Sequence, residues 1–195
     1  MQIQIGRATN GTFTPGDLQA MHRLRHDVFR TRLGWEVEVV DGEERDQFDA
    51  LDPVYVMVKD ADALMGCWRL LPTTGPTMIT DTFAQTVQDG DVPRGGHTWE
   101  LSRFALGRHE GVASRFSGAA LAMMEAAVDW GLQQGVARFV TVTTVAIERL
   151  MRTLGIRVRR MGQPVQVGIE RAVALEIPLD GQVLMALRAK LAAAA

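Results

Sequence analysis

Residues Trp99–Phe104 read Trp-Glu-Leu-Ser-Arg-Phe, and this short segment is the most informative stretch of the chain. The composition is typical of a β-strand, in which alternate side chains point to opposite faces of a sheet. Strict alternation places Arg103 on the face of the odd-numbered residues, and Glu100 with Phe104 on the face of the even-numbered ones. A β-bulge in the strand would instead move Arg103 toward the face of Glu100. An isolated buried ion is very costly, so each charge needs a partner or a pocket. The segment is either a strand with structural salt bridges or one that lines an active site.

The composition is that of an ordinary globular protein. A chain of 195 residues with 47% hydrophobic residues predicts one domain over 1–195 with a substantial core. The net charge of −2 gives no reason to expect a nucleic acid or a membrane as partner. Cys67 is the only cysteine, which indicates a cytoplasmic protein without an intramolecular disulfide. We expect no bound metal, because the histidines have no useful ligand spacing, and we find no signal peptide.

Charge is distributed unevenly along the chain. The segment 36–52 contains eight acidic residues and one basic residue, whereas 149–168 contains five arginines and no acid. Either segment alone is explained as solvated surface. Together they would suit a cationic small substrate and an anionic macromolecular partner.

The segment after Thr14 predicts a helix. Thr14 is a capping residue, proline and aspartate follow in the first turn, and the helix should run to about Leu33 and stop at Gly34. Arg25 and Arg32 fall near the middle of its apolar stripe. They must either extend toward solvent at the helix edge or pair with buried carboxylates, and the acidic segment is the obvious source of such partners.

The remaining pattern predicts an α/β fold, more closely an α+β three-layer sandwich with a mixed twisted sheet flanked by helices. Residues 34–53 are expected to form a long loop, and loops of this length are often functional. Strands are expected at about 54–58, 64–71, 99–106, 137–144 and 171–177, with helices at about 81–88, 112–134, 145–154 and 180–194.

Several polar groups have both a structural and a functional interpretation. Asp46 and Asp49 are either solvated or partners for the helix arginines. Arg69, inside an apolar strand, forms an ion pair with Glu100 or a loop acid, or binds a substrate carboxylate. The segment 108–113 is either a plain loop or an anion-binding turn at a helix N-terminus.

These segments resemble the acyl-homoserine-lactone synthases of quorum sensing, the LuxI-type autoinducer synthases, over nearly the whole chain. Val140–Val145 and Gly168–Leu175 are most similar to the branch that makes long-chain 3-oxoacyl signals. The positions typical of the family are all occupied in the expected order: Arg25, Phe29, Trp35, Asp46, Asp49, Arg69, Phe83, Glu100 and Arg103.

The resemblance implies the fold of the N-acetyltransferases (GNAT-like) and an acyltransferase without a cofactor. Its substrates would be S-adenosylmethionine and the thioester of an acidic acyl carrier protein. The amine of S-adenosylmethionine attacks the thioester, and its carboxylate then displaces methylthioadenosine to close the lactone. A medium- to long-chain, possibly 3-oxo, acyl group is expected. The alternative is an acyl-CoA-dependent N-acyltransferase of the GNAT class. A degenerate synthase acting only as a binding protein would have lost a charged family position, and none is lost.

The resemblance also implies roles for individual residues. Glu100 is the candidate general base, and Arg103 and Arg69 complete the catalytic group. An N-terminal lid at about 14–52, together with Phe83, would bind S-adenosylmethionine through Arg25, Phe29, Trp35, Asp46 and Asp49. The half from about 107 to 195 would hold the acyl chain with Phe104, Leu121, Met124 and Thr143, and would dock the carrier protein with Arg149 and Arg152.

Overall fold

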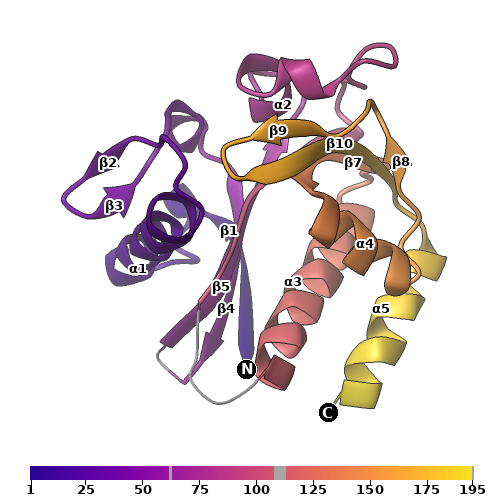
Figure 1. The fold of residues 1–195 in the computed structure, drawn as a ribbon. Helices are drawn as coiled ribbons and strands as arrows, with labels where there is room; N and C mark the ends of the chain where they lie inside the picture. Colours follow the sequence, from indigo (N-terminus) through magenta and orange to yellow (C-terminus); the bar gives the residue numbers. More distant parts are fainter. Residues whose placement is uncertain (62, 108–112, 195) are drawn as a thin grey trace.

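The centre of the molecule is a twisted sheet, seen in the computed structural model, which describes residues 1–61, 63–107 and 113–194 (Figure 1). Its strand order is β1-β4-β5-β6-β7-β10-β8, and β9 also pairs with β10. Neighbouring strands are antiparallel except for β6 and β7, which are parallel. The strands are β1 (Gln2–Arg7), β4 (Val54–Asp60), β5 (Ala63–Pro72), β6 (Thr98–Leu106), β7 (Arg138–Thr144), β8 (Arg159–Arg160), β9 (Val165–Val167) and β10 (Glu170–Pro178).

Helices cover both faces of this sheet, as the predicted layered fold requires. Figure 1 shows α3 (Ala113–Gln133) and α5 (Gly181–Ala194) side by side on one face, with α4 (Val145–Thr153) near them. On the other face lie α1 (Pro15–Arg25) and the small hairpin of β2 (Val39–Val40) and β3 (Glu43–Glu44). The larger apolar core joins the sheet to α3 and α5, and a second core lies under α1.

The N-terminal helix forms as the sequence predicts. The Thr14 hydroxyl accepts a hydrogen bond from the backbone of Asp17, and the Asp17 carboxylate accepts one from the backbone of Thr14. This capping box satisfies N–H groups that the first turn leaves open. After α1 the chain continues as a π-helix, η2 (His26–Arg32), and turns away at Gly34, where φ is +64°. The wider π turn follows Arg25 directly and contains Phe29.

Three local predictions were wrong. The expected helix at 81–88 is replaced by α2 (Met78–Asp81) and the 3₁₀ turn η4 (Ala84–Thr86). The expected loop at 34–53 contains the β2–β3 hairpin and the 3₁₀ turn η3 (Gln47–Leu51). Strand β1 was not predicted, although its sequence Gln-Ile-Gln-Ile alternates as an edge strand should. A further 3₁₀ turn, η1 (Ala8–Asn10), follows β1, and most of the anion-binding turn expected at 108–113 lies outside the described residues.

The parallel pair β6 and β7 separates part of the way along its length. Pairing runs from Thr98 opposite Arg138 to Leu101 opposite Thr141 and then ends. Beyond this point β6 continues beside β5 as far as Leu106, while β7 continues beside β10 as far as Thr144. The two strands therefore open into a wedge in the middle of the sheet, and the main cavity of the protein lies there.

Candidate active site

A β-bulge in β6 overturns the face assignment expected from simple alternation. Cys67 of β5 lies opposite Ala105, yet Arg69 lies opposite Ser102, so β6 contains one extra residue between these pairs. Arg103 adopts a left-handed conformation with φ of +57°. A bulge of this kind reverses the direction of the side chains that follow it. The strain at a non-glycine residue is of the order of 1–3 kcal/mol, which surrounding contacts must offset.

The bulge places the charged and aromatic side chains of this part of β6 on opposite faces of the sheet. Arg103 turns to the face of Glu100 and Ser102, where its guanidinium lies 5.1 Å from the ring centroid of Phe29. Phe104 turns to the opposite face and packs edge-on against Trp68, with ring centroids 4.9 Å apart. Both placements differ from the predicted alternation, because the extra residue shifts the alternation by one position.

Three buried arginines and three carboxylates form an ion network behind the cavity. Arg25 donates from Nε to Glu44 at 2.5 Å and from both terminal nitrogens to Asp49 at 2.7 and 2.8 Å. Arg69 donates to Asp46 at 2.5 Å and to Asp49 at 2.8 Å. The six groups are balanced in charge, which is what a buried cluster requires.

Arg103 completes this network from the bulge. Its guanidinium contacts Glu44 at 2.8 Å and Asp46 at 2.9 Å. Burial acts to raise the pKa of Asp49, but the hydrogen bonds and charge of Arg25, supported by Arg69, hold that pKa well below its usual range. The network therefore ties α1 and the acidic segment to β5 and to the bulge in β6.

The sequence analysis predicted part of this network and missed part. The partners of Arg25 do come from the acidic segment, and Arg69 pairs with loop acids, not with Glu100. Arg32 does not pair with that segment, because it donates to the Leu106 carbonyl and lies 3.4 Å from Asp27. Glu44, fully buried, was not chosen as a site residue. Its position in the acidic segment, two residues before Asp46, was the feature that could have identified it.

Glu100 is held differently from the other buried carboxylates. Its two oxygens accept hydrogen bonds from the backbone N–H groups of Met78, at 2.9 Å, and Ile79, at 2.5 Å. No arginine, lysine or histidine of the described chain forms an ion pair with it. Burial raises its pKa to about 7, against the lowering effect of the two backbone hydrogen bonds. A carboxylate with such a pKa can accept a proton near neutral pH.

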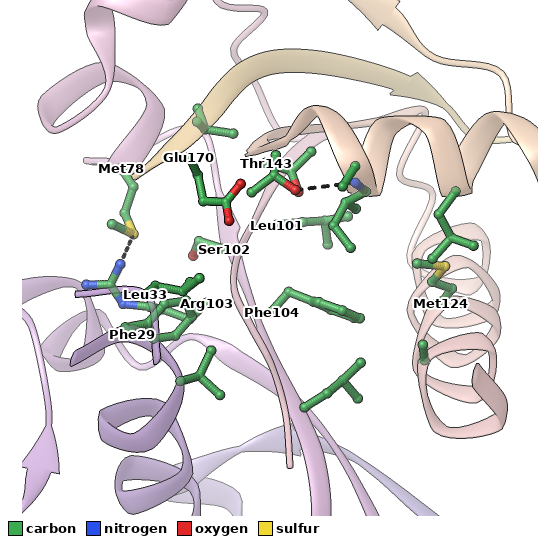
Figure 2. Close-up of a pocket in the computed structure, with 18 of the residues that line it drawn as sticks. Phe29, Leu33, Met78, Leu101, Ser102, Arg103, Phe104, Met124, Thr143 and Glu170 are labelled. Carbon is green, nitrogen blue, oxygen red and sulfur yellow. Dashed lines mark hydrogen bonds between the residues drawn. The ribbon is translucent and has the colours of Figure 1, made fainter. Parts of the chain in front are cut away.

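The cavity between β6 and β7 has a volume of about 430 Å³. Glu100, Ser102 and Arg103 line it on the β6 side. Figure 2 shows the Glu170 carboxylate facing Ser102, and the Met78 sulfur beside Arg103, whose Nη1 lies 3.5 Å from it. Arg25, Asp46, Asp49 and Arg69 are not among the lining residues. The rest of the ion network therefore stands behind the wall that Arg103 contributes.

Three aromatic rings form one wall of the cavity. Phe29 stacks on Trp35 with ring centroids 5.3 Å apart, and Phe83 meets Trp35 edge-on at 6.3 Å. All three line the cavity. A flat aromatic surface beside a polar corner is a suitable place for a heteroaromatic ring. The structure thus brings Phe83 beside two rings, Phe29 and Trp35, that lie far from it in the sequence.

The rest of the cavity is apolar. Phe104, Leu121, Met124 and Thr143, which the sequence analysis assigned to an acyl-chain pocket, all line it. They come from β6, α3 and β7, and Figure 2 shows Phe104 and Met124 on the side away from Arg103. One continuous space therefore joins an aromatic wall, a polar corner at Glu100 and an apolar arm.

The arginines of 149–160 are largely neutralised by acids from elsewhere in the fold. Arg152 and Arg160 both pair with Glu148, while Arg159 pairs with Glu176. Arg149 is exposed on α4, and within the described ranges no carboxylate pairs with it. Its neighbour Leu150 lines the cavity. Of the two predicted docking residues, Arg149 is thus the one whose charge is open to a partner.

No group of three or more histidine, cysteine, aspartate or glutamate side chains among the described residues is placed to hold a metal ion. None of the described helices is long and apolar enough to cross a membrane.

Comparisons with known proteins agree on one family. The family model described as Autoinducer synthase matches residues 12–187. The acyl-homoserine-lactone synthase of Pseudomonas aeruginosa is 41% identical over 190 residues, covering 96% of this chain and 94% of that protein. The crystal structure of the AHL synthase LasI superposes with a TM-score of 0.90 at 41% identity, covering 96% and 94% of the two chains.

More distant structures share the fold. The CoA-dependent acyl-homoserine lactone synthase BjaI, solved with SAM and isopentyl-CoA, gives a TM-score of 0.87 at 27% identity, with 97% and 89% coverage. A putative N-acetyltransferase from Lactobacillus plantarum gives 0.61 at 16% identity, covering 92% of this chain and all of that one. Fold and site together define an acyltransferase with a GNAT-like fold. The chain belongs to the autoinducer synthase family, and it is an acyl-homoserine-lactone synthase.

Proposed function

We propose that this synthase transfers an acyl group from an acyl carrier protein to the amine of S-adenosylmethionine and then closes the lactone with release of methylthioadenosine. The observation that carries the proposal is Glu100, a buried carboxylate with which no described basic side chain pairs, at the polar corner of a cavity that also has the aromatic wall and the apolar arm. Both substrates can meet at such a corner, with the acyl chain extending to one side and the adenosine to the other.

Glu100 acts as the general base for amide formation. The ammonium of S-adenosylmethionine must lose a proton before its nitrogen can attack the thioester carbon. A base with a pKa of about 7 is matched to this task at neutral pH. Backbone N–H groups of β6 beyond Leu101, where β7 no longer pairs with the strand, are the proposed donors to the oxyanion. The thiolate of the carrier then leaves. Of the two protons that the ammonium loses on becoming an amide N–H, one passes to Glu100 directly or through water and the other goes to the leaving thiolate.

Lactone closure depends mainly on the conformation of the substrate. The carboxylate oxygen attacks the γ-carbon as the bond from that carbon to sulfur breaks, and the electron pair goes to sulfur. Phe29, Trp35 and Phe83 hold the adenosine part, so that the flexible chain folds back within the cavity. Arg25, Asp46, Asp49 and Arg69 support this reaction indirectly, by fixing the lid at 14–52 against β5 and β6.

Met124 limits the depth of the acyl arm in this proposal. It is buried on α3 and lines the cavity opposite Phe104. Met124→Trp should therefore shift the preferred donor to acyl chains shorter by several carbons, measured as kcat/KM over a series of acyl thioesters. Met185→Trp, at a methionine that is 72% exposed on α5, is the control and should leave the preference unchanged. The same chain-length preference in both variants would place the end of the acyl chain elsewhere.

Arg149 and Arg152 form the proposed docking surface for the acidic carrier protein. Arg149→Glu is the sharper test, because Arg152 is already paired with Glu148. We expect KM for the acyl-carrier substrate to rise about tenfold with a smaller change in kcat, since charges at the rim of an interface mainly affect encounter. Arg23→Glu, an exposed arginine on α1, is the control. An equal effect of both reversals would contradict docking on α4.

An acyl-CoA donor is the second candidate, and the likeness to a CoA-dependent relative supports it. The test is to incubate the purified protein with S-adenosylmethionine and matched acyl-carrier and acyl-CoA thioesters of medium and long chains, with and without a 3-oxo group. Mass spectrometry then follows acyl-homoserine lactone and methylthioadenosine. Turnover with the carrier and not with CoA supports the proposal. Turnover with CoA alone, or with neither donor, overturns it.

The chain is further proposed to work as one unit in the cytoplasm. Its single cysteine is buried in the second core, as expected for a protein of a reducing compartment. The lid at 14–52 and the half from 107 to 195 contribute opposite walls of the same cavity.

A further inference from the structure

A second carboxylate, that of Glu170, lines the same cavity as Glu100. Glu170 is the first residue of β10 and follows the turn at Gly168. Figure 2 shows its carboxylate turned into the cavity, between Met78 and Thr143 and facing Ser102. This residue had no role in the sequence analysis or in the reaction described above.

Glu170 forms no ion pair, unlike the cations that share the cavity wall. Arg103 is held by Glu44 and Asp46, and Arg32 lies beside Asp27. Within the described part of the chain, no basic side chain lies within ion-pair distance of Glu170. A half-buried carboxylate without a partner gives this part of the cavity a net negative charge, which a cationic ligand can neutralise.

The turn before Glu170 packs against the aromatic wall. Gly168 has φ of +57°, and a Cβ atom there would lie 3.3 Å from Cδ1 of Trp35. Trp35 itself stacks on Phe29. Glu170, two residues beyond Gly168, therefore lies close to the aromatic wall, and Figure 2 shows its carboxylate facing Ser102.

This position matches the order of groups in S-adenosylmethionine, in which the sulfonium lies between the adenosine and the amino acid part. We propose that Glu170 binds the sulfonium of S-adenosylmethionine by charge attraction, an assignment that rests on the proposed function of the cavity. With adenosine on the aromatic wall and the amine at Glu100, the sulfonium falls opposite the carboxylate of Glu170. In this arrangement the amine contacts Glu100 and not Glu170.

The role has a kinetic consequence. When the lactone closes, the electron pair from the breaking carbon–sulfur bond neutralises the sulfonium, so the attraction to Glu170 weakens in the transition state. A carboxylate at this position therefore stabilises the bound substrate more than the transition state of lactone closure. Removing its charge should raise KM for S-adenosylmethionine about tenfold and should not lower kcat.

The test compares three ligands by calorimetry on the wild type and on Glu170→Gln, which keeps the shape and removes the charge. S-adenosylmethionine has both cations, S-adenosylhomocysteine keeps the ammonium but has a neutral sulfur, and methylthioadenosine has neither. We expect the dissociation constant to rise about tenfold for S-adenosylmethionine and by less than twofold for the other two. Glu176→Gln, at a glutamate of the same strand that does not line the cavity and pairs with Arg138 and Arg159, is the control.

Each other outcome overturns the assignment. Equal weakening of S-adenosylmethionine and S-adenosylhomocysteine would place Glu170 at the ammonium. Equal weakening of all three ligands, or of none, would make it a structural residue. Glu170→Lys should weaken S-adenosylmethionine further and leave methylthioadenosine bound, which keeps the test valid if the glutamine variant is poorly folded. Failure of the wild type to bind S-adenosylmethionine would instead contradict the proposed function.

Discussion

Glu100→Gln should lower the rate of acyl-homoserine-lactone formation at least 100-fold, the lower end of what a positioned general base contributes. The change keeps the size of the side chain and removes the group proposed to accept the proton from the amine. The measurement is kcat/KM for product and methylthioadenosine at saturating acyl donor. Glu176→Gln, a buried glutamate of β10 that does not line the cavity, is the matched control and should stay within a fewfold of wild type. Wild-type activity in Glu100→Gln would contradict the role as a base and leave Glu100 with a structural role, as the acceptor for the first N–H groups of α2.

The same variant tests the raised pKa through stability. The pKa of Glu100 in the folded protein, about 7, lies above its ordinary value of 4.5, so the folded state binds the proton more tightly than the unfolded chain. The stability this provides is complete below pH 4.5 and is lost as the pH rises through about 7. The unfolding free energy of wild type minus that of Glu100→Gln should therefore fall by about 2–3 kcal/mol between pH 5 and 8. A difference that is independent of pH would contradict the raised pKa.

Arg69→Met should destabilise the fold by about 3–5 kcal/mol, the range found when one partner of a buried ion pair is removed. The substitution fills a similar volume but leaves Asp46 and Asp49 with less compensating charge in a site where Arg69 has no exposed surface. Urea denaturation near pH 7 measures the loss. Arg152→Met, which breaks a half-exposed pair with Glu148, should cost no more than about 1 kcal/mol.

A double variant separates lost charge balance from lost packing. Asp46→Asn removes the carboxylate that Arg69 neutralises, so the pair Arg69→Met with Asp46→Asn should recover part of the stability lost by the first change. Strictly additive losses would mean that Arg69 stabilises the fold through its packing alone. A loss below 1 kcal/mol from Arg69→Met would show that the network does not hold the lid.

Most of the secondary structure could be predicted because its signals are local. The cap at Thr14, the stop at Gly34 and the β-branched run of β7 each reflect interactions among residues close in sequence. The short helix α2 was misplaced because it is held by a distant group. Its first N–H groups donate to Glu100, and nothing within the segment itself indicates that partner.

The sequence by itself was enough to propose which residues carry the chemistry, because the family positions can be identified in order along the chain and the acidic segment had to supply partners for Arg25. Only the tertiary structure decided which partner each of these charged groups has. The bulge at Arg103 turns that side chain to the face of Glu100, which alternation could not show, because one extra residue in a strand leaves no local signal in an arginine. Burial then separates the carboxylates. Glu44, Asp46 and Asp49 are neutralised by three arginines, whereas Glu100 receives only backbone N–H groups and keeps a pKa near 7. That difference depends on which groups the fold brings within a few ångströms of each carboxylate.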